Sequence, residues 1–90
     1  MKVLRKPLYM QSLQEIEDHI AIDNPVAALD MWLHIEDQVD KLADPNFPRR
    51  RGRVAGTLEL VAHANYVVIL QQTPDTVTVL DVLHAARKYP

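Results

Sequence analysis

Four polar residues near the C-terminus could do acid–base chemistry or bind an anion. His84 ends a run of β-forming residues, and Arg87, Lys88 and Tyr89 follow it closely. An imidazole can act as a general acid or base near neutral pH, and cationic side chains can stabilise the negative charge that develops in phosphoryl transfer. The simpler interpretation is a histidine at a strand end followed by a solvated basic tail. Both interpretations stay open from these residues alone.

A second basic cluster lies in the middle of the chain. Arg49, Arg50, Arg51 and Arg53 place four guanidinium groups within five residues. Such a cluster suits a phosphate backbone or an acidic peptide. It equally suits a solvated loop that keeps the chain in solution. The sequence pI of about 6.0 argues against a dedicated nucleic-acid-binding protein.

The charges are unevenly distributed along the chain. Residues 11–44 carry nine acidic residues against one lysine, whereas residues 45–90 carry six basic residues against three acidic ones. Residues 1–10 add three basic residues, and the net charge is −2. We expect either ordinary solvated helix faces or an acidic helical side opposite a basic loop-and-sheet side that faces an anion or an acidic partner.

We expect no metal, no cofactor and no membrane span. The chain has no Cys, which excludes disulfides and thiolate ligands. Its four histidines, at positions 19, 34, 63 and 84, lack the spacing of a metal site. No apolar run approaches the roughly 18 residues that cross a bilayer, and the N-terminus lacks the long apolar region of a secretory signal.

The elements that position these residues follow from apolar spacing and turn residues. Apolar residues at three- and four-residue spacing predict a first helix from about residue 8 to residue 21. Asn24 is a good N-cap and Pro25 suits the first helical position, so a second helix is expected to begin there and to end before Pro45. Strands are expected at residues 2–5, 57–62, 66–71 and 76–83, with a loop at residues 45–56.

These elements predict a single α+β domain over residues 1–90. We expect an N-terminal strand, an antiparallel two-helix hairpin and then a three-stranded antiparallel meander, with the helices on one face of the sheet. The almost wholly apolar segment 66–71 is expected to be a central strand covered on both faces. Trp32 lies in the apolar stripe of the second helix, where a core position is favoured over an aromatic anchor for a partner.

In the order and spacing of its segments, the chain resembles the RelE/ParE superfamily of toxins from bacterial type II toxin–antitoxin systems. The resemblance covers nearly the whole chain. The segments that carry it are Ala21-Ile-Asp-Asn-Pro-Val-Ala-Ala28, Gly52-Arg-Val-Ala-Gly-Thr-Leu-Glu-Leu-Val61, Asn65-Tyr-Val-Val-Ile-Leu70, Asp75-Thr-Val-Thr-Val-Leu80 and Val82-Leu-His-Ala-Ala-Arg-Lys-Tyr-Pro90.

The resemblance implies a small cytoplasmic toxin that forms a hetero-oligomer with a cognate antitoxin. Such antitoxins lay a helix, often with an extended segment, across apolar surface of the toxin. We therefore expect the helix hairpin and a sheet edge to hold the antitoxin, with Leu13, Ile16 and Trp32 as contact residues.

The resemblance also implies one of two activities. RelE-like members cleave messenger RNA on the ribosome and need several basic residues, whereas ParE-like members poison DNA gyrase and need no catalytic set. Many nuclease relatives carry basic residues or a tyrosine where this chain has Leu58, Val67, Asp81 and Ala85. Each missing donor would remove roughly 2–4 kcal/mol of transition-state stabilisation.

We therefore favour the ParE-like activity, by protein contact, with DNA gyrase as the leading target. The residues expected to face the target are Arg49, Arg50, Arg51, Arg53, His84, Arg87, Lys88 and Tyr89. One alternative is a ribosome-dependent messenger RNA endonuclease with His84, Arg87 and Lys88 as catalytic residues. The other is a toxin fold that serves only as a binding module.

Overall fold

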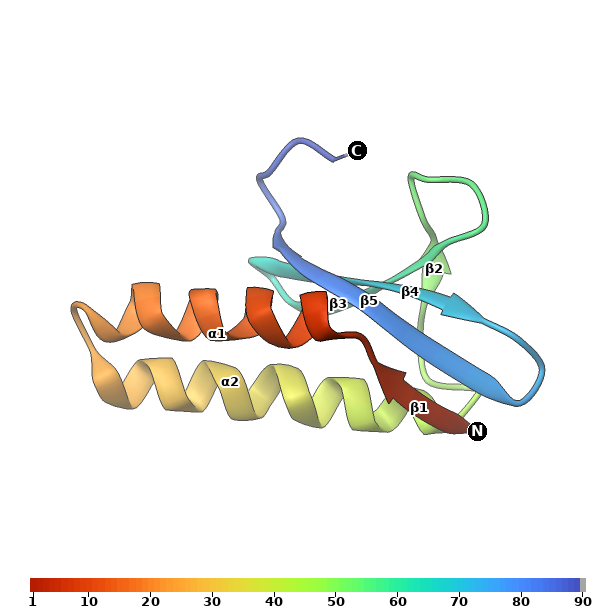
Figure 1. Ribbon diagram of the computed structural model, residues 1–90, viewed down its shortest axis with the longest axis horizontal. Coiled ribbons are helices and arrows are strands. Elements are labelled where there is room, and N and C mark those ends of the chain that lie inside the picture. Colours follow the sequence, from red (N-terminus) through yellow and green to blue (C-terminus); the bar gives the residue numbers. More distant parts are fainter. Residues whose placement is uncertain (90) are drawn as a thin grey trace.

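Helices α1 (Pro7–Ala21) and α2 (Pro25–Asp40) form a hairpin that packs on one face of a sheet in the computed structural model, which describes residues 1–89 (Figure 1). Both helices begin at a proline, whose fixed φ suits the first helical position. The Asn24 side chain accepts a hydrogen bond from the N–H of Ala27 at 3.0 Å, which caps α2. The predicted helix break is confirmed, and α1 begins one residue earlier than expected.

The sheet contains five strands in the order β1-β5-β4-β3-β2. Their bounds are β1 (Lys2–Arg5), β2 (Arg50–Arg51), β3 (Leu58–His63), β4 (Tyr66–Gln72) and β5 (Thr76–His84), and a short 3₁₀ helix η1 (Lys41–Ala43) follows α2. Strands β3, β4 and β5 form the predicted antiparallel meander. Residue 90, the last residue of the predicted domain, lies outside the described residues.

The structure adds two features to the predicted N-terminal strand, helix hairpin and three-stranded meander. Strand β1 joins the sheet parallel to β5, with Val3 opposite Val77. The long connection between them, which contains the helix hairpin, permits parallel pairing where a tight turn would not. Strand β2 pairs with β3 inside the segment expected to be a loop. Its two arginines carry no apolar alternation that could have predicted a strand.

The core has one large cluster and one small cluster on opposite faces of the sheet. The large cluster fills the space between helices and sheet and includes Leu13, Ile35 and Val68. The small cluster, on the face turned away from the helices, contains Val67, Ile69 and Leu83, with Leu80 and Tyr89 packed against it. Residues 67–70 are each at most 4% exposed, so the prediction of a central strand covered on both faces is confirmed.

The β2–β3 loop and the C-terminal tail come together on the face of the sheet turned away from the helices. Figure 1 shows the C-terminal tail and the β2–β3 loop both rising on that side, while the helix hairpin extends beyond the sheet on the other. The N–H of Ala85 donates to the carbonyl of Asn65 at 2.7 Å, which ties the tail to the β3–β4 turn. Among residues 1–89, no helix is long and apolar enough to cross a membrane.

Candidate functional site

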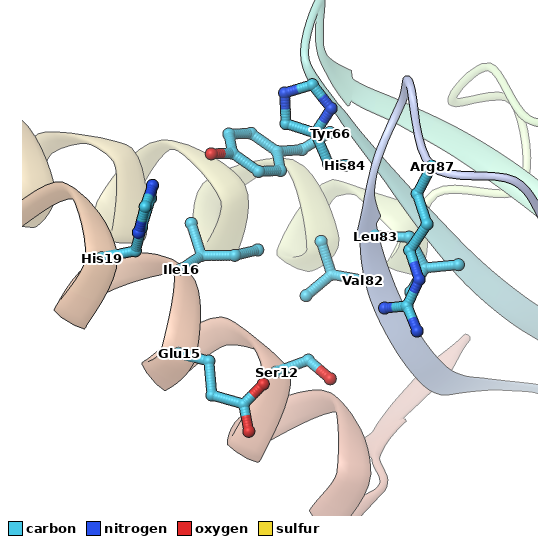
Figure 2. Close-up of a pocket in the computed structure, with 9 residues that line it drawn as sticks. All are labelled: Ser12, Glu15, Ile16, His19, Tyr66, Val82, Leu83, His84 and Arg87. Atoms are coloured by element: carbon cyan, nitrogen blue, oxygen red, sulfur yellow. The ribbon is translucent and has the colours of Figure 1, made fainter.

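A groove of about 340 Å³ lies between α1 and the end of β5. Figure 2 shows its two walls, one from α1 and one from β4, β5 and the start of the tail. The residues that line it are Ser12, Glu15, Ile16, His19, Tyr66, Val82, Leu83, His84 and Arg87. The groove therefore combines an apolar floor with two imidazoles, one carboxylate and one guanidinium.

Helix α1 supplies four of these side chains from one face. Positions 12, 15, 16 and 19 are spaced by three, one and three residues, so their side chains lie on adjoining turns. Ile16 is half-buried and packs against the large core cluster, whereas Glu15 and His19 are exposed. The helix is held against the sheet by its apolar residues, and this packing presents its polar residues to the end of β5.

The end of β5 fixes the orientation of His84. Its Nδ1 accepts a hydrogen bond from the N–H of Ala86 at 3.1 Å, and its carbonyl accepts one from the N–H of Arg87 at 2.9 Å. The ring of Tyr66 lies edge-on to it, with the centroids 5.4 Å apart. Because Nδ1 accepts, the neutral imidazole carries its proton on Nε2 and presents a donor there.

The aromatic contact between Tyr66 and His84 belongs to a longer row of rings at this end of the sheet. Tyr66 lies 6.1 Å from His63, and His63 lies 5.8 Å from His34, centroid to centroid. The Nε2 of His34 makes a 2.7 Å hydrogen bond to the carbonyl of Ala62. The row connects α2 to β3, β4 and the end of β5. Among residues 1–89, no group of three or more His, Cys, Asp or Glu side chains could hold a metal ion.

The four arginines predicted to face a target have different contacts in the structure. The guanidinium of Arg49 donates to the carbonyls of Leu42, Asp44 and Phe47 and to the side chain of Gln72. Burial lowers the pKa of Arg49, and the charge of Asp44 opposes that shift. Arg49 therefore has a structural role at the end of η1, and its expected contact with a target stays a prediction.

Two further arginines of this cluster bind a buried carboxylate. Glu59 is 1% exposed. Its Oε1 accepts from Nε and Nη2 of Arg50 at 3.2 and 3.1 Å, and its Oε2 accepts from the backbone N–H of Arg53 at 3.1 Å. The guanidinium carbon of Arg53 also lies 5.9 Å from the ring centroid of Tyr89. Arg51 is exposed and makes no ion pair within residues 1–89.

The three residues expected to contact an antitoxin differ in their burial. Leu13 is fully buried in the large cluster, and its expected contact with an antitoxin stays a prediction. Ile16 and Trp32 are half-buried and pack against the same cluster. These three residues therefore lie on the inner, core-facing side of the hairpin.

The residues whose identities argued against a nuclease in the sequence have structural roles here. Val67 is 4% exposed in the small core cluster. Leu58 packs against the large cluster. The carboxylate of Asp81 accepts a 2.8 Å hydrogen bond from the N–H of Val82, at the irregularity in the β4–β5 pairing. Ala85 ties the tail to the β3–β4 turn.

The sequence pattern identifies His84 and Arg87 but not the other polar residues of the groove. Nothing in the sequence connects Ser12, Glu15, His19 and Tyr66 with His84. The spacing of positions 12, 15, 16 and 19 on one helix face was the available signal. That face lies beside His84 only because α1 packs next to β5. The spacing alone therefore could not predict that these residues share a groove with His84.

Comparisons with known proteins agree with one another. The family model described as the ParE toxin of the type II toxin–antitoxin system, parDE, matches residues 3–89. The toxin candidate Y4kP of Sinorhizobium fredii (strain NBRC 101917 / NGR234) is 35% identical over 82 residues, which cover 90% of this chain and 84% of that protein. A solved structure from the chromosomal ParDE TA system of P. aeruginosa matches with a TM-score of 0.80 at 20% identity, over 93% of this chain and 95% of the solved chain. This structural match shows a common fold.

Proposed function

The chain belongs to the family of ParE toxins of type II toxin–antitoxin systems, and from this premise we propose that it inhibits growth by protein contact, with DNA gyrase as the leading target. In this proposal a cognate antitoxin neutralises the toxin in the cytoplasm. The antitoxin occupies the helix hairpin and a sheet edge, and the target meets the basic side of the molecule.

The observation that carries the proposal is the contact between Arg53 and Tyr89. It joins the β2–β3 loop to the C-terminal tail on the face turned away from the helices. Exposed Arg51 lies in the first segment, and exposed Arg87 and Lys88 lie in the second. Two basic segments far apart in the sequence are therefore joined beside an aromatic ring, while the Arg87 side chain turns to the groove (Figure 2). Their exposed cations suit an acidic protein partner.

The proposal is tested by expressing the chain alone and by adding the purified protein to purified gyrase. We expect growth arrest with intact messenger RNA and loss of DNA supercoiling by gyrase. The double variant Arg87→Ala/Lys88→Ala should lose both effects, because it removes two positive charges that attract the target. Lys6→Ala removes an exposed base next to α1 and should keep both effects. Normal supercoiling at saturating toxin would contradict gyrase as the target.

A second candidate function is messenger RNA cleavage, favoured by the groove that collects His84, Arg87 and Glu15. In this alternative His84 acts as the general acid or base, and Arg87 suits a charged phosphate. This function requires codon-position-specific cleavage on the ribosome that disappears in His84→Ala while the folded protein persists. No growth defect in any host would instead favour the inert binding module.

A further inference from the structure

A row of large aliphatic side chains lies unpartnered on the outer side of α2. Val26, Leu29 and Leu33 follow one another at spacings of three and four residues and are 71%, 53% and 56% exposed. Ile22, in the turn that precedes α2, is 79% exposed. We call these four residues the outer stripe. Their spacing is that of one helix face, and it is also the spacing of a seam between two helices.

Helix α2 is apolar on two sides. Its inner side buries Ala28, Ile35 and Val39 against the rest of the molecule. One apolar side is enough to hold a helix on its own domain, so the outer stripe has no role in holding the hairpin to the sheet. The stripe also lies on the part of the molecule that extends beyond the sheet (Figure 1). Exposed aliphatic rows of this kind are typical of interaction surfaces.

Acidic residues border the outer stripe. Asp30 directly follows Leu29, and Asp37 directly follows Glu36. The two aspartates are seven residues apart, which places them along one edge of the stripe. Asp37 binds Lys41 at 3.2 Å, whereas Asp30 makes no ion pair within residues 1–89. Glu36 and Asp40, where the stripe would continue, are both held by Arg5. The stripe is therefore apolar along its centre and negative along one edge.

This charge pattern disfavours a second copy of the chain as the occupant. In an antiparallel pair of α2 helices, the edge with Asp30 and Asp37 would face the same edge of the other copy. The wider segment 11–44 carries nine acids against Lys41, so any approach of two hairpins adds repulsion. A partner with Lys or Arg along its own edge instead meets opposite charge.

We propose that the outer stripe docks a helix of a partner protein that is apolar at alternating three- and four-residue spacing and carries Lys or Arg along the edge that meets Asp30 and Asp37. The inference deepens the proposed neutralisation and rests on the proposed function only for the identity of the protein that carries this helix. The docking chemistry itself is tested without growth assays, an antitoxin or gyrase.

The probes are two synthetic three-heptad helices with Leu at every seam position. One has Lys at both positions that flank the seam, and the other has Glu at the same positions. A fluorescent label on each probe reports binding through its anisotropy. We expect the Lys helix to bind at least about tenfold more tightly than the Glu helix, and to weaken as salt screens the charges.

The matched variants distinguish binding at the outer stripe from nonspecific hydrophobic binding. Leu29→Ser/Leu33→Ser should weaken binding of the Lys helix by about tenfold or more, because it removes the apolar anchors. Leu8→Ser changes an equally exposed leucine on α1, at 54%, and should leave binding unchanged. Asp30→Asn should weaken binding and reduce its salt dependence.

Three results would overturn the proposal. Equal binding of the Lys and Glu helices would show that charge does not select the partner. Equal effects of the Leu8 and Leu29/Leu33 variants would show that the outer stripe is not the docking site. A dimer of the chain alone in sedimentation that Leu29→Ser dissociates would make a second copy the occupant. Circular dichroism of each variant confirms that the fold is retained, as expected for exposed positions.

Discussion

Tyr9 is a single buried side chain that connects three elements. It is fully buried, and its hydroxyl donates to Oε1 of Glu36 at 3.0 Å, while Nη2 of Arg5 binds Oε2 of the same carboxylate at 2.9 Å. Burial raises the pKa of Tyr9 far above its usual value, and the negative charge of Glu36 adds to the shift. Burial alone would lower the pKa of Arg5, but Asp40 and Glu36 outweigh it and raise that pKa. The fold thus holds a neutral phenol beside a charged guanidinium.

The raised pKa of Tyr9 predicts a loss of stability at alkaline pH. A group whose pKa is higher in the folded state contributes stability that is fully present below its unfolded pKa, near 10.0, and is lost as pH rises above it. We expect the free energy of unfolding to fall by about 1.4 kcal/mol per pH unit from this group. Urea unfolding between pH 8 and pH 11 should show this fall in the wild type and in Tyr66→Phe. A fall of the same size in Tyr9→Phe would contradict the prediction.

The carboxylate of Glu59 predicts a second effect at a single residue. Glu59→Gln keeps the shape of the side chain but removes the charge that holds Arg50 and Arg53, at a cost of about 1–3 kcal/mol. The cost stays moderate because the two arginine side chains are 56% and 40% exposed and can be hydrated once released. Trypsin should cut faster after Arg51 or Arg53 in this variant. Asp75→Asn, an exposed change in the β4–β5 turn, should leave the cleavage rate unchanged.

At the scale of elements, the sequence predicts those that local chemistry determines. Asn24 and Pro25 place the start of α2, and β-branched runs place β4 and β5. Contacts between distant residues were beyond reach, such as the contact between Arg49 and Gln72. Helix α2 gives the clearest limit. It carries two overlapping apolar rows, and periodicity alone does not show which row faces the sheet. The inner row was identified, and the outer stripe was missed for that reason.

The β2–β3 loop gives a prediction at the scale of one element. Gly52 donates its N–H to the carbonyl of Thr57 at 2.9 Å, and a Cβ at this position would lie 2.9 Å from that oxygen and closer still to the Thr57 hydroxyl. Gly52→Ala should therefore separate β2 from β3, which hydrogen exchange of the Arg50 and Glu59 amides would detect. Gly56 has φ +83° with open space around it, so Gly56→Asn should keep the strand pairing. Faster exchange in the Gly56 variant than in the Gly52 variant would contradict this account.

The whole molecule separates its charges into two sides. The acidic hairpin carries the outer stripe, and the basic loop and tail lie across the sheet from it (Figure 1). The contact between Arg53 and Tyr89 and the bond between Ala85 and Asn65 hold the basic side together without using any residue of the outer stripe. If the two proposed surfaces act on different partners, changes on one side should leave the function of the other side intact.

A pair of variants tests this separation directly. Leu29→Ser/Leu33→Ser should still arrest growth, because the basic surface is untouched, but co-expression of the antitoxin should no longer restore growth. Arg87→Ala/Lys88→Ala should lose growth arrest yet still form the antitoxin complex in size-exclusion chromatography. Each variant is the other's control, since both change two exposed residues and neither touches the large core cluster. Loss of both properties in either variant would show that the antitoxin and the target share one surface. Neutralisation would then be direct competition for the basic side rather than capture by the hairpin.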